Sequence, residues 1–592
     1  MSVSAKKLVE EVFTTTVAEQ IWTANTLLVL PPTLQGFAVG SVMPAVFYMF
    51  RRGCRRGRGR FQHAFSRPDR GADIWSVAGK LSQDSQSFVG FDTDVEKNIL
   101  GDLLLCDALE NKAHKEGHTE EIQRAFPVHF LSSWLDLPPS VGHLRFVPEM
   151  IVSLLANQTE GQKVHVSQPS AATPFPVGQN PESNLFLKVF GRGVIFGQNT
   201  ADLCADSVDE QATLSIEELL MIRLAQACDE APESLRATRS AMPHIQNLWP
   251  ASQRAACSFR EDITSFLENY GSTIPRRAIT PMLESLLGLG LLTIYLESCT
   301  IAVIWDNTAE IPPLAAQKPA LIFADASNGT ESRLRDLSEQ SFEEITRLLD
   351  QATTSMAQIR ILNAMLWDDP ELSSSKPSGP DNSLWLKLLG DVRNRSHDAS
   401  ALALRDLRLK NNRLAEKLEA ANIEPDAIDI LRAPNSSQNP VQTAAEALCA
   451  MMGEKLLRTN YLKFLDSCLM VNESHGLARK RRVSRNLAGR KRKATDVRSA
   501  ILSNTLLETL VHLHLVNRDG VLSFAEFLRI LRERYGIWVD ECPPGVSAQR
   551  EDLLNNRAML ERRLRDLGLL VGVNDAEFMK HLRPRFQRNN QP

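Results

Sequence analysis

The last hundred residues place the tightest restriction on the fold, because they combine three helical patterns with a short hairpin pattern. A first helix is predicted over Ser499–Leu515, where apolar residues recur at helical spacing. A second begins at Ser523, which with Glu526 has the spacing of a capping box. A third covers 552–567, with leucines on one side. We therefore expect three packed helices followed by a small sheet.

The hairpin pattern is typical of a wing. LLVGV and EFMKHLRPRF have the composition of strands and flank Asn574 and Asp575, a favourable turn pair. Three helices followed by two strands is the order of a winged helix, which we predict over 495–592. In such a unit the third helix is the one that enters the major groove of DNA. The arginines predicted to face outward from this helix are Arg557, Arg562, Arg563 and Arg565.

A strongly basic stretch precedes the predicted winged helix. Nine of the fifteen residues in 479–493 are Lys or Arg, which leaves little apolar surface for independent folding. We predict a flexible arm that, together with the third helix, contacts about six phosphates, so that DNA affinity falls about a thousandfold between 50 and 200 mM salt. The predicted contact residues of the arm are Arg479, Lys480, Arg481, Arg482, Arg490, Lys491, Arg492 and Lys493.

Charge is unevenly distributed along the 592 residues, although the net charge is only -4. From residue 479 onward there are 23 basic and 13 acidic residues, whereas the preceding part has 44 basic and 58 acidic residues. A basic end on an acidic body favours a nucleic-acid partner for the C-terminal part. The hydrophobic content of 43% excludes wholesale disorder, and the aromatic content of 6% predicts aliphatic cores.

Polar stretches rich in Pro, Ser, Gly and Asn divide the chain into several domains. The parts between them have mainly helical patterns, so we predict a mainly α, multidomain α+β fold. We find no alternation of strands and helices typical of a doubly wound sheet. The predicted parts are a mainly helical domain with an Arg-rich loop at 1–165, an α+β domain at 184–370 that begins with a hairpin at 185–197, a helical domain at 384–470, the basic arm at 479–493 and the winged helix at 495–592.

A second winged-helix-like unit is predicted near 259–306. FREDITSFLENYG has the pattern of a helix, and Thr280 and Pro281 are suited to begin another. LLTIYLE and TIAVIW then have the composition of strands. Because Arg276 and Arg277 precede the second helix, we expect a structural unit, and contact with nucleic acid is left open.

Six arginines separated by glycines lie between residues 51 and 60 and have two interpretations. They predict either a flexible contact with phosphates, with Phe61 or Phe65 stacking on a base, or a basic loop paired with the acidic body. The residues concerned are Arg51, Arg52, Arg55, Arg56, Arg58 and Arg60.

Residues 20–50 contain no charged side chain and end at these arginines, as a membrane span would. Prolines and glycines interrupt the apolar run, so we expect a buried segment of a soluble domain instead. The N-terminus lacks the pattern of a signal peptide, and nine scattered cysteines without a CxxC pair indicate reduced thiols. A cytoplasmic location is expected.

No sequence motif identifies an enzyme, a metal site or a cofactor. There is no P-loop and no GxSxG, and His114 and His118 lack the Glu that a zincin places after its first His. We therefore expect a non-enzymatic protein with neither metal nor cofactor. A metal-dependent nuclease is the main alternative, because acidic residues are plentiful in 307–372.

One helical stretch has a short coiled-coil pattern. Leu404, Leu407, Leu414 and Leu418 occupy a and d positions, and Asn411 occupies an a position, where it would fix the register of a two-stranded coil. The run is shorter than three heptads. An intramolecular helical hairpin is therefore favoured, with a homodimer as the alternative.

Three phrases of the sequence carry a resemblance to a known group of proteins: MPAVFYMFRRGCRRGRGRF, residues 472–515, and LLNNRAMLERRLRDLGLLVGVNDAEFMKHLRPRF. They resemble bacterial proteins of phage-defence islands, in particular an accessory subunit of methylation-associated defence systems. The resemblance implies a cytoplasmic accessory or sensor component beside other subunits. Together with the basic C-terminal part, it predicts a protein that binds double-stranded DNA in an anti-phage defence complex. A protein-interaction scaffold that does not bind DNA is the third hypothesis, after the nuclease.

Overall fold

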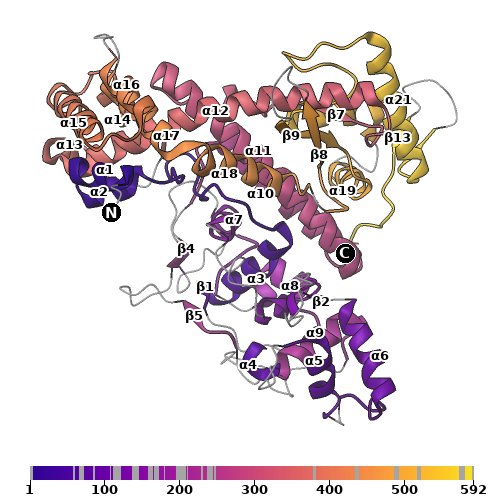
Figure 1. Cartoon of the computed structure of the whole chain (residues 1–592). Helices are drawn as coiled ribbons and strands as arrows, with labels where there is room; N and C mark the ends of the chain where they lie inside the picture. Colours follow the sequence, from indigo (N-terminus) through magenta and orange to yellow (C-terminus); the bar gives the residue numbers. More distant parts are fainter. Residues whose placement is uncertain are drawn as a thin grey trace. The chain divides into compact units, whose positions relative to one another are not determined.

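The computed structural model separates the chain into two compact units, whose elements are labelled in Figure 1. Unit 1 comprises 1–36, 248–262 and 285–585, and unit 2 comprises 37–247, 263–284 and 586–592. The structure describes residues 4–57, 61–65, 72–84, 87–106, 108–110, 122–135, 144, 146–157, 164–165, 173–178, 181–194, 209, 211–228, 231–235, 244–245, 248–377, 382–433, 439–471, 473–485, 493–516, 522–572 and 580–589.

The protein is mainly helical, as predicted, and it also contains a small mixed sheet. Outside the C-terminal part, the helices of unit 1 are α1 (Ala5–Phe13), α2 (Thr15–Ile21), η5 (Leu314–Ala316), α12 (Ser332–Asp368), α13 (Pro370–Ser374), α14 (Asn382–Arg393), α15 (Ser400–Ala421), α16 (Pro425–Arg432), α17 (Pro440–Leu456) and α18 (Arg458–Cys468). Two further helices, α10 (Gln253–Tyr270) and α11 (Arg276–Thr308), have residues in both units.

The long helix α12 connects the two ends of unit 1 (Figure 1). One end of α12 packs on a sheet, and the other packs against α17, α14 and α2. Two serines bring the helix close to the sheet: Ser338 Oγ donates to Phe323 O at 2.7 Å, and Ser341 Oγ accepts from Phe323 N at 3.2 Å. These small side chains satisfy backbone groups that would otherwise be buried without partners.

The sheet has the order β11-β7-β9-β8, formed by β11 (Ile537–Trp538), β7 (Ile322–Asp325), β9 (Lys493–Ile501) and β8 (Ala478–Arg485). β7 is parallel to both β9 and β11, whereas β8 and β9 form an antiparallel hairpin. The sequence did not predict these parallel pairings. The flexible arm predicted at 479–493 is also wrong over 479–485, because this segment is paired with β9 in the sheet.

Three helices and a second small sheet follow β9. The helices are α19 (Asn504–Leu515), α20 (Phe524–Tyr535) and α21 (Arg550–Asp566), and the antiparallel strands are β10 (Leu522–Ser523), β12 (Leu570–Val571) and β13 (His581–Leu582), in the order β10-β13-β12. Ser523 caps α20 by accepting from Glu526 N at 3.2 Å. Gly568 follows α21 with a φ of 70°, a conformation that suits glycine after a helix. The turn predicted at Asn574 and Asp575 lies outside the described residues.

Unit 2 contains short helices and small two-stranded sheets. Its helices are η1 (Val39–Ser41), α3 (Val42–Arg52), α4 (Phe61–Phe65), α5 (Ile74–Leu81), α6 (Asp94–Leu105), η2 (Phe130–Trp134), α7 (Val147–Ala156), η3 (Pro181–Ser183), α8 (Leu185–Phe190) and α9 (Ile216–Gln226). Its strand pairs are β1 (Arg55–Arg56) with β5 (Ser234–Leu235), β2 (Ala108–Glu110) with β3 (Ile122–Ala125), and β4 (Val164–His165) with β6 (His244–Ile245). Part of its core is aromatic rather than aliphatic, because the buried rings of Phe47 and Phe50 each pack against the ring of Phe186.

Two segments predicted as strands are helical. The second winged-helix-like unit near 259–306 is wrong, because LLTIYLE and TIAVIW lie within the single helix α11. No turn residue separates these two apolar runs, and burial on all sides suits a core helix as well as a strand. An ideal Cβ on Gly290 would lie only 2.2 Å from Phe259, so this glycine permits close packing on α10.

The hairpin predicted to start at 185 is instead helix α8, followed by a turn.

The apolar segment 20–50 forms no continuous helix, since it contains the end of α2, irregular chain, η1 and most of α3. Among the described residues, α11 is the helix long and apolar enough to cross a membrane, and 78% of its most apolar window is buried. Such burial is typical of a core helix. The coiled-coil leucines of α15 are likewise buried inside unit 1, and Asn411 Nδ2 donates to Pro440 O at 3.0 Å. This packing agrees with the intramolecular alternative.

Candidate nucleic-acid interface

Helix α21 is held in place by one buried polar side chain and two leucines. Asn556 has no exposed surface; its Nδ2 donates to Ala324 O at 2.9 Å and to Val539 O at 2.8 Å, and its Oδ1 accepts from Ala326 N at 2.8 Å. Leu560 and Leu564 are also fully buried. One side of α21 is thereby fixed against the body of unit 1.

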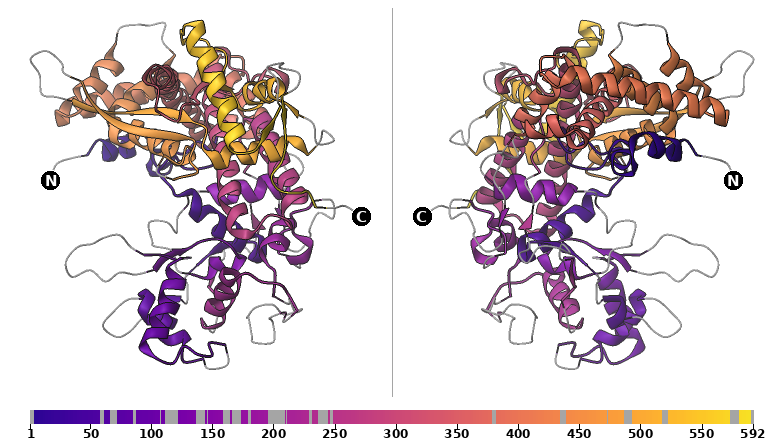
Figure 2. Two further views of the ribbon diagram at one scale, coloured as in Figure 1. Left: turned by 90° about the vertical axis from the view of Figure 1, so that its right-hand side faces the viewer. Right: turned by 90° about the vertical axis from the view of Figure 1, so that its left-hand side faces the viewer.

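The opposite side of α21 is exposed and carries polar and basic groups. Asn555, Ala558, Arg562 and Arg565 recur at intervals of three and four, so they lie along one helical face. The Arg562 side chain is 84% exposed, and its nearest acidic group, Asp566, is 3.9 Å away. Arg565 donates to Glu561 in the preceding turn at 2.7 Å. Figure 2 shows α21, in yellow, at the periphery of unit 1.

Arg563 does not face outward as predicted. It is half-buried and donates to Ala326 O at 3.2 Å, to Asn504 Oδ1 at 2.9 Å and to Leu502 O. Burial lowers the pKa of its guanidinium. At about 100° per residue, position 563 lies only about 60° from the buried Leu560 direction, which explains this structural role.

Arg557 is on the other flank of the buried face, also about 60° from Leu560. Its guanidinium carbon lies 5.7 Å from the centre of the Phe524 ring, at the start of α20. Of the four arginines predicted on this helix, the structure therefore places two, Arg562 and Arg565, on the face that points away from the protein.

The strands after α21 are tied to the helices by ion pairs. Lys580 Nζ lies 2.8 Å from Glu561 on α21, and Arg585 Nη1 lies 3.2 Å from Glu508 on α19. Arg583 Nε donates to Gly568 O at 2.9 Å. These basic groups position the small sheet beside α21, since each is engaged by a group of the same unit.

The basic residues of β8 differ in how far they are neutralised. Arg481 forms a bidentate pair with Glu339 of α12, at 2.6 and 2.8 Å, and its pKa is raised by this hydrogen bonding. Arg479 donates to Asn328 O at 2.9 Å. The Arg482 side chain is exposed and makes neither a hydrogen bond nor an ion pair with any described residue. Among the β8 side chains that the structure describes, it is the one best placed to meet an external anion.

Lys480 lies between two carboxylates, 3.0 Å from Asp466 and 3.2 Å from Asp496. Partial burial opposes a rise in its pKa, but the hydrogen bonds and charges of the two carboxylates outweigh it, so the pKa is raised. Arg490, Lys491 and Arg492 lie outside the described residues, and for Lys493 only the backbone, in β9, is described.

The arginines that follow α3 serve the interior of unit 2. Arg55 pairs with Glu149 and lies 4.5 Å from the Phe146 ring centre, and Arg56 donates to the carbonyls of Ser133 and Leu135. Burial, followed by the charge of the neighbouring Arg52, lowers the pKa of Arg51 to about 10. Of the two interpretations, these contacts fit the basic segment paired within the protein. Arg58 and Arg60 lie outside the described residues.

The acidic stretch considered for a nuclease is used for local structure. Asp325 is fully buried, and its carboxylate accepts from Ser327 N at 2.8 Å and from Gly329 N at 2.9 Å. Glu339 of the same stretch pairs with Arg481 at 2.6 Å. Within the described part of the chain, no group of His, Cys, Asp and Glu side chains is arranged to hold a metal ion. His114 and His118 lie outside that part.

The sequence did not point to two features of this part of the protein, one on the outward face of α21 and one buried behind it. Asn555 and Ala558 share the outward face of α21 and could have been found by rotating the helix away from Leu560 and Leu564. His512 of α19 is buried; its Nδ1 donates to Glu508 O at 2.7 Å, and its Nε2 accepts from Arg585 N at 3.0 Å. Burial lowers its pKa to about 4. His512 thus connects α19 to the chain after β13, a pairing that no local pattern reveals.

Comparison with known proteins identifies the family. Neither the curated proteins nor the solved structures gave a match. The family model of the methylation-associated defense system protein MAD7 matches residues 29–586, which is nearly the whole chain. This match confirms the resemblance seen in the three phrases of sequence. The chain therefore belongs to the family of the methylation-associated defense system protein MAD7.

Proposed function

We propose that the chain binds duplex DNA as a non-enzymatic, cytoplasmic accessory or sensor component of an anti-phage, methylation-associated defence complex. The observation that carries this proposal is the outward face of α21, with Asn555, Ala558, Arg562 and Arg565. Arginine can pair bidentately with guanine, asparagine can pair with adenine, and a methyl side chain can contact thymine. This face has the chemistry required to read base edges in a major groove.

The surrounding elements support the same function. Three helices with an antiparallel sheet of order β10-β13-β12 form the arrangement expected of a winged helix, and we propose that α19 to β13 is one. Glu561 contacts both Arg565 and Lys580, so it links the proposed reading helix to the proposed wing. Other subunits of the defence complex are the expected protein partners, because the family is defined by membership of such a system.

The two single variants Arg562→Ala and Arg565→Ala, and the double variant that combines them, test whether α21 reads DNA. Arg562→Ala and Arg565→Ala should each weaken binding to a preferred duplex, selected from a random pool, by about 1–3 kcal/mol. Binding to other duplexes should change less. The matched control is Arg529→Ala, which removes an exposed arginine of α20 that also pairs with glutamates of its own helix. Affinities are measured by fluorescence anisotropy at one salt concentration.

Leu564→Ala separates the fold from the function, because it removes a fully buried side chain of α21. It should cost about 2–5 kcal/mol of stability. If the double arginine variant keeps full affinity while Leu564→Ala unfolds this part of the chain, α21 is not a DNA-reading helix and the scaffold hypothesis takes its place. Degradation of plasmid DNA that needs Mg²⁺ would instead support the nuclease.

The salt dependence of binding should be shallower than the number of basic residues suggests. Of the described residues predicted to bind DNA, several are engaged within the protein, and we take the exposed Arg482, Arg562 and Arg565 as the contacts with the charged DNA. Three such contacts predict a loss of about fortyfold in affinity between 50 and 200 mM salt. A thousandfold loss would show that the residues around 490 also bind phosphate, and no loss would contradict electrostatic DNA binding.

A further inference from the structure

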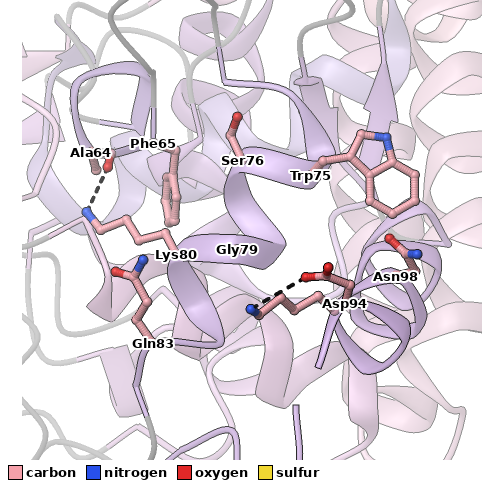
Figure 3. Close-up of a pocket in the computed structure, with 10 residues that line it drawn as sticks. Ala64, Phe65, Trp75, Ser76, Gly79, Lys80, Gln83, Asp94 and Asn98 are labelled. Atoms are coloured by element: carbon pink, nitrogen blue, oxygen red, sulfur yellow. Dashed lines mark hydrogen bonds and ion pairs between the residues drawn. The ribbon is translucent and has the colours of Figure 1, made fainter. Parts of the chain in front are cut away.

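Large apolar side chains are exposed at several places in the described part of the chain. In unit 2, Trp75 is 48% exposed beside an open pocket whose lining also includes Lys80, Asp94 and Asn98 (Figure 3). This mixture of groups favours no single class of ligand. The exposed face of α15 differs, because its apolar and charged side chains follow one another in a regular order along a single helix.

Helix α15 lies at the end of unit 1 away from the mixed sheet (Figure 1), and its two faces differ in burial. The leucines considered for a coiled coil, from Leu404 to Leu418, are buried within unit 1 and therefore cannot pair with a second chain. On the opposite face, Leu402 and Leu409 are 62% and 58% exposed. They are two helical turns apart, so they lie on the same side of the helix.

Four exposed charged residues surround Leu409 on this face. Arg405 and Asp406 precede it, and Arg413 and Glu416 follow it. At about 100° per residue, all four lie within about 60° of the Leu409 direction. Asp406 and Arg413 lie on one flank of the face, whereas Arg405 and Glu416 lie on the other. Each flank therefore has one acidic and one basic residue, on opposite sides of Leu409 along the helix.

The two arginines of this face lack a counter-ion within the described chain, because Arg405 and Arg413 make neither a hydrogen bond nor an ion pair with any described residue. Asp406 lies 2.9 Å from Lys410, but its side chain is 57% exposed and can meet a second cation. Before residue 479 the sequence has 58 acidic and 44 basic residues, so carboxylates are in excess there. Unpaired arginines beside exposed leucines indicate a surface that another molecule completes.

The order of charges makes this face complementary to itself. In a two-fold symmetric dimer, the same surface of both copies meets. When two helices pack antiparallel, the N-terminal half of one lies against the C-terminal half of the other. With Leu409 at the symmetry axis, Asp406 of one copy would then meet Arg413 of the second, and Arg405 would meet Glu416. Antiparallel packing also places opposite ends of the helix dipoles beside each other.

We propose that the protein forms a homodimer in which α15 packs antiparallel on α15 of a second copy. Leu409 lies at the symmetry axis, and the ion pairs of Asp406 with Arg413 and of Arg405 with Glu416 fix the register. One helix from each copy is a small interface, so the dimer should dissociate reversibly on dilution. The proposal goes beyond DNA binding and does not depend on it. If α21 binds DNA, the dimer would bring two copies of that helix to one duplex.

Sedimentation of the full chain over a range of concentrations should show a monomer–dimer equilibrium. Leu409→Asp should weaken dimerisation at least about tenfold, because it places two carboxylates against each other at the axis. The matched control is Leu554→Asp, which changes a leucine of α21 that is 56% exposed and should leave dimerisation unchanged. Thermal unfolding of each variant checks that it remains folded.

Exchanging charges gives a sharper test. Asp406→Arg and Arg413→Asp should each be monomeric alone, because like charges then meet at two places in the dimer. An equimolar mixture of the two variants should form a heterodimer, since each Arg then meets an Asp of the other chain. A chain that carries both substitutions should dimerise again. Damage to the fold of either variant would not be reversed by mixing, so recovery reports the contact itself.

Cysteine substitutions determine the arrangement of the two helices. Leu409→Cys should form a disulfide-linked dimer on mild oxidation, because the two copies of this position meet at the axis. Leu402→Cys should not, because its two copies lie about 21 Å apart in the antiparallel pair. The unsubstituted chain, which has an exposed thiol at Cys106, gives the background.

Four results would overturn the proposal: a monomer at every concentration, a dimer that Leu409→Asp leaves intact, no recovery on mixing the charge variants, or cross-linking of Leu402→Cys as efficient as that of Leu409→Cys. The Arg562→Ala, Arg565→Ala double variant should dimerise normally, and Leu409→Asp should retain a folded α21. Dimerisation and DNA reading can therefore fail separately.

Discussion

Replacing Asn556 with leucine is expected to lower the free energy of unfolding of unit 1 by about 3–5 kcal/mol, among the largest effects of a single substitution. Leucine has a similar volume but cannot replace the three hydrogen bonds that Asn556 makes to Ala324, Ala326 and Val539. Each buried backbone group left without a partner costs about 1–3 kcal/mol. The loss of these bonds should release α21 from β7 and from the chain after β11.

The matched control is Asn555→Leu, one residue earlier on the exposed face of α21. It should change stability by no more than about 0.5 kcal/mol. Denaturant unfolding measures the total effect, and hydrogen exchange of the α21 amides shows where it acts. Equal stability of the two variants would contradict the role assigned to Asn556.

Acidification should destabilise the protein through histidines that are buried in the neutral form. Nε2 of His512 must remain unprotonated to accept from Arg585 N, and burial lowers the pKa of this side chain to about 4. The unfolded chain takes up a proton near the ordinary value of 6.5, whereas the folded chain does so only near 4. The stabilisation is therefore fully present above pH 6.5 and is lost as the pH falls to 4. At about 1.4 kcal/mol per pKa unit, the loss is about 3 kcal/mol.

His512→Gln tests this pH dependence, because glutamine can donate and accept but does not titrate. The variant should lose less stability than the wild type between pH 6.5 and 4, as measured by unfolding at several pH values and by hydrogen exchange around 580–585. Parallel curves for the two proteins would contradict the prediction. His129 in unit 2, whose pKa burial lowers to about 3, adds an effect of the same sign in both proteins.

The helices of the C-terminal part could be predicted from the sequence because their signals are local. Ser523 caps α20 and Gly568 follows α21, as predicted, and each acts within a few residues of its own helix. The mixed sheet could not be predicted in the same way. β7 and β9 are separated by more than 150 residues of mainly helical chain, so no short-range alternation reveals their parallel pairing.

The candidate interface was predicted only in part for the same reason. The sequence shows where arginines are concentrated, but not which carboxylates meet them after folding. Glu339, which neutralises Arg481, comes from α12, and Asp466, which holds Lys480, comes from α18. Along α21 the local pattern was sufficient, because the direction of Leu560 and Leu564 decides which arginines are exposed. The distribution of basic residues therefore overstates the positive charge available to a ligand.

The position of β8 at the end of the sheet gives its basic residues a second consequence. The strand order leaves the outer side of β8 without a neighbouring strand among the described residues, and such an edge can pair with the edge of another molecule. Lysine and arginine along an edge strand oppose that pairing, because their charged side chains would lose contact with water when another strand approaches. Neutralising Arg479, Lys480, Arg481 and Arg482 together would remove this protection and expose an eight-residue strand to aggregation. A loss of activity in that variant would then report self-association of the protein as much as lost ligand contacts, so these residues are best replaced one at a time.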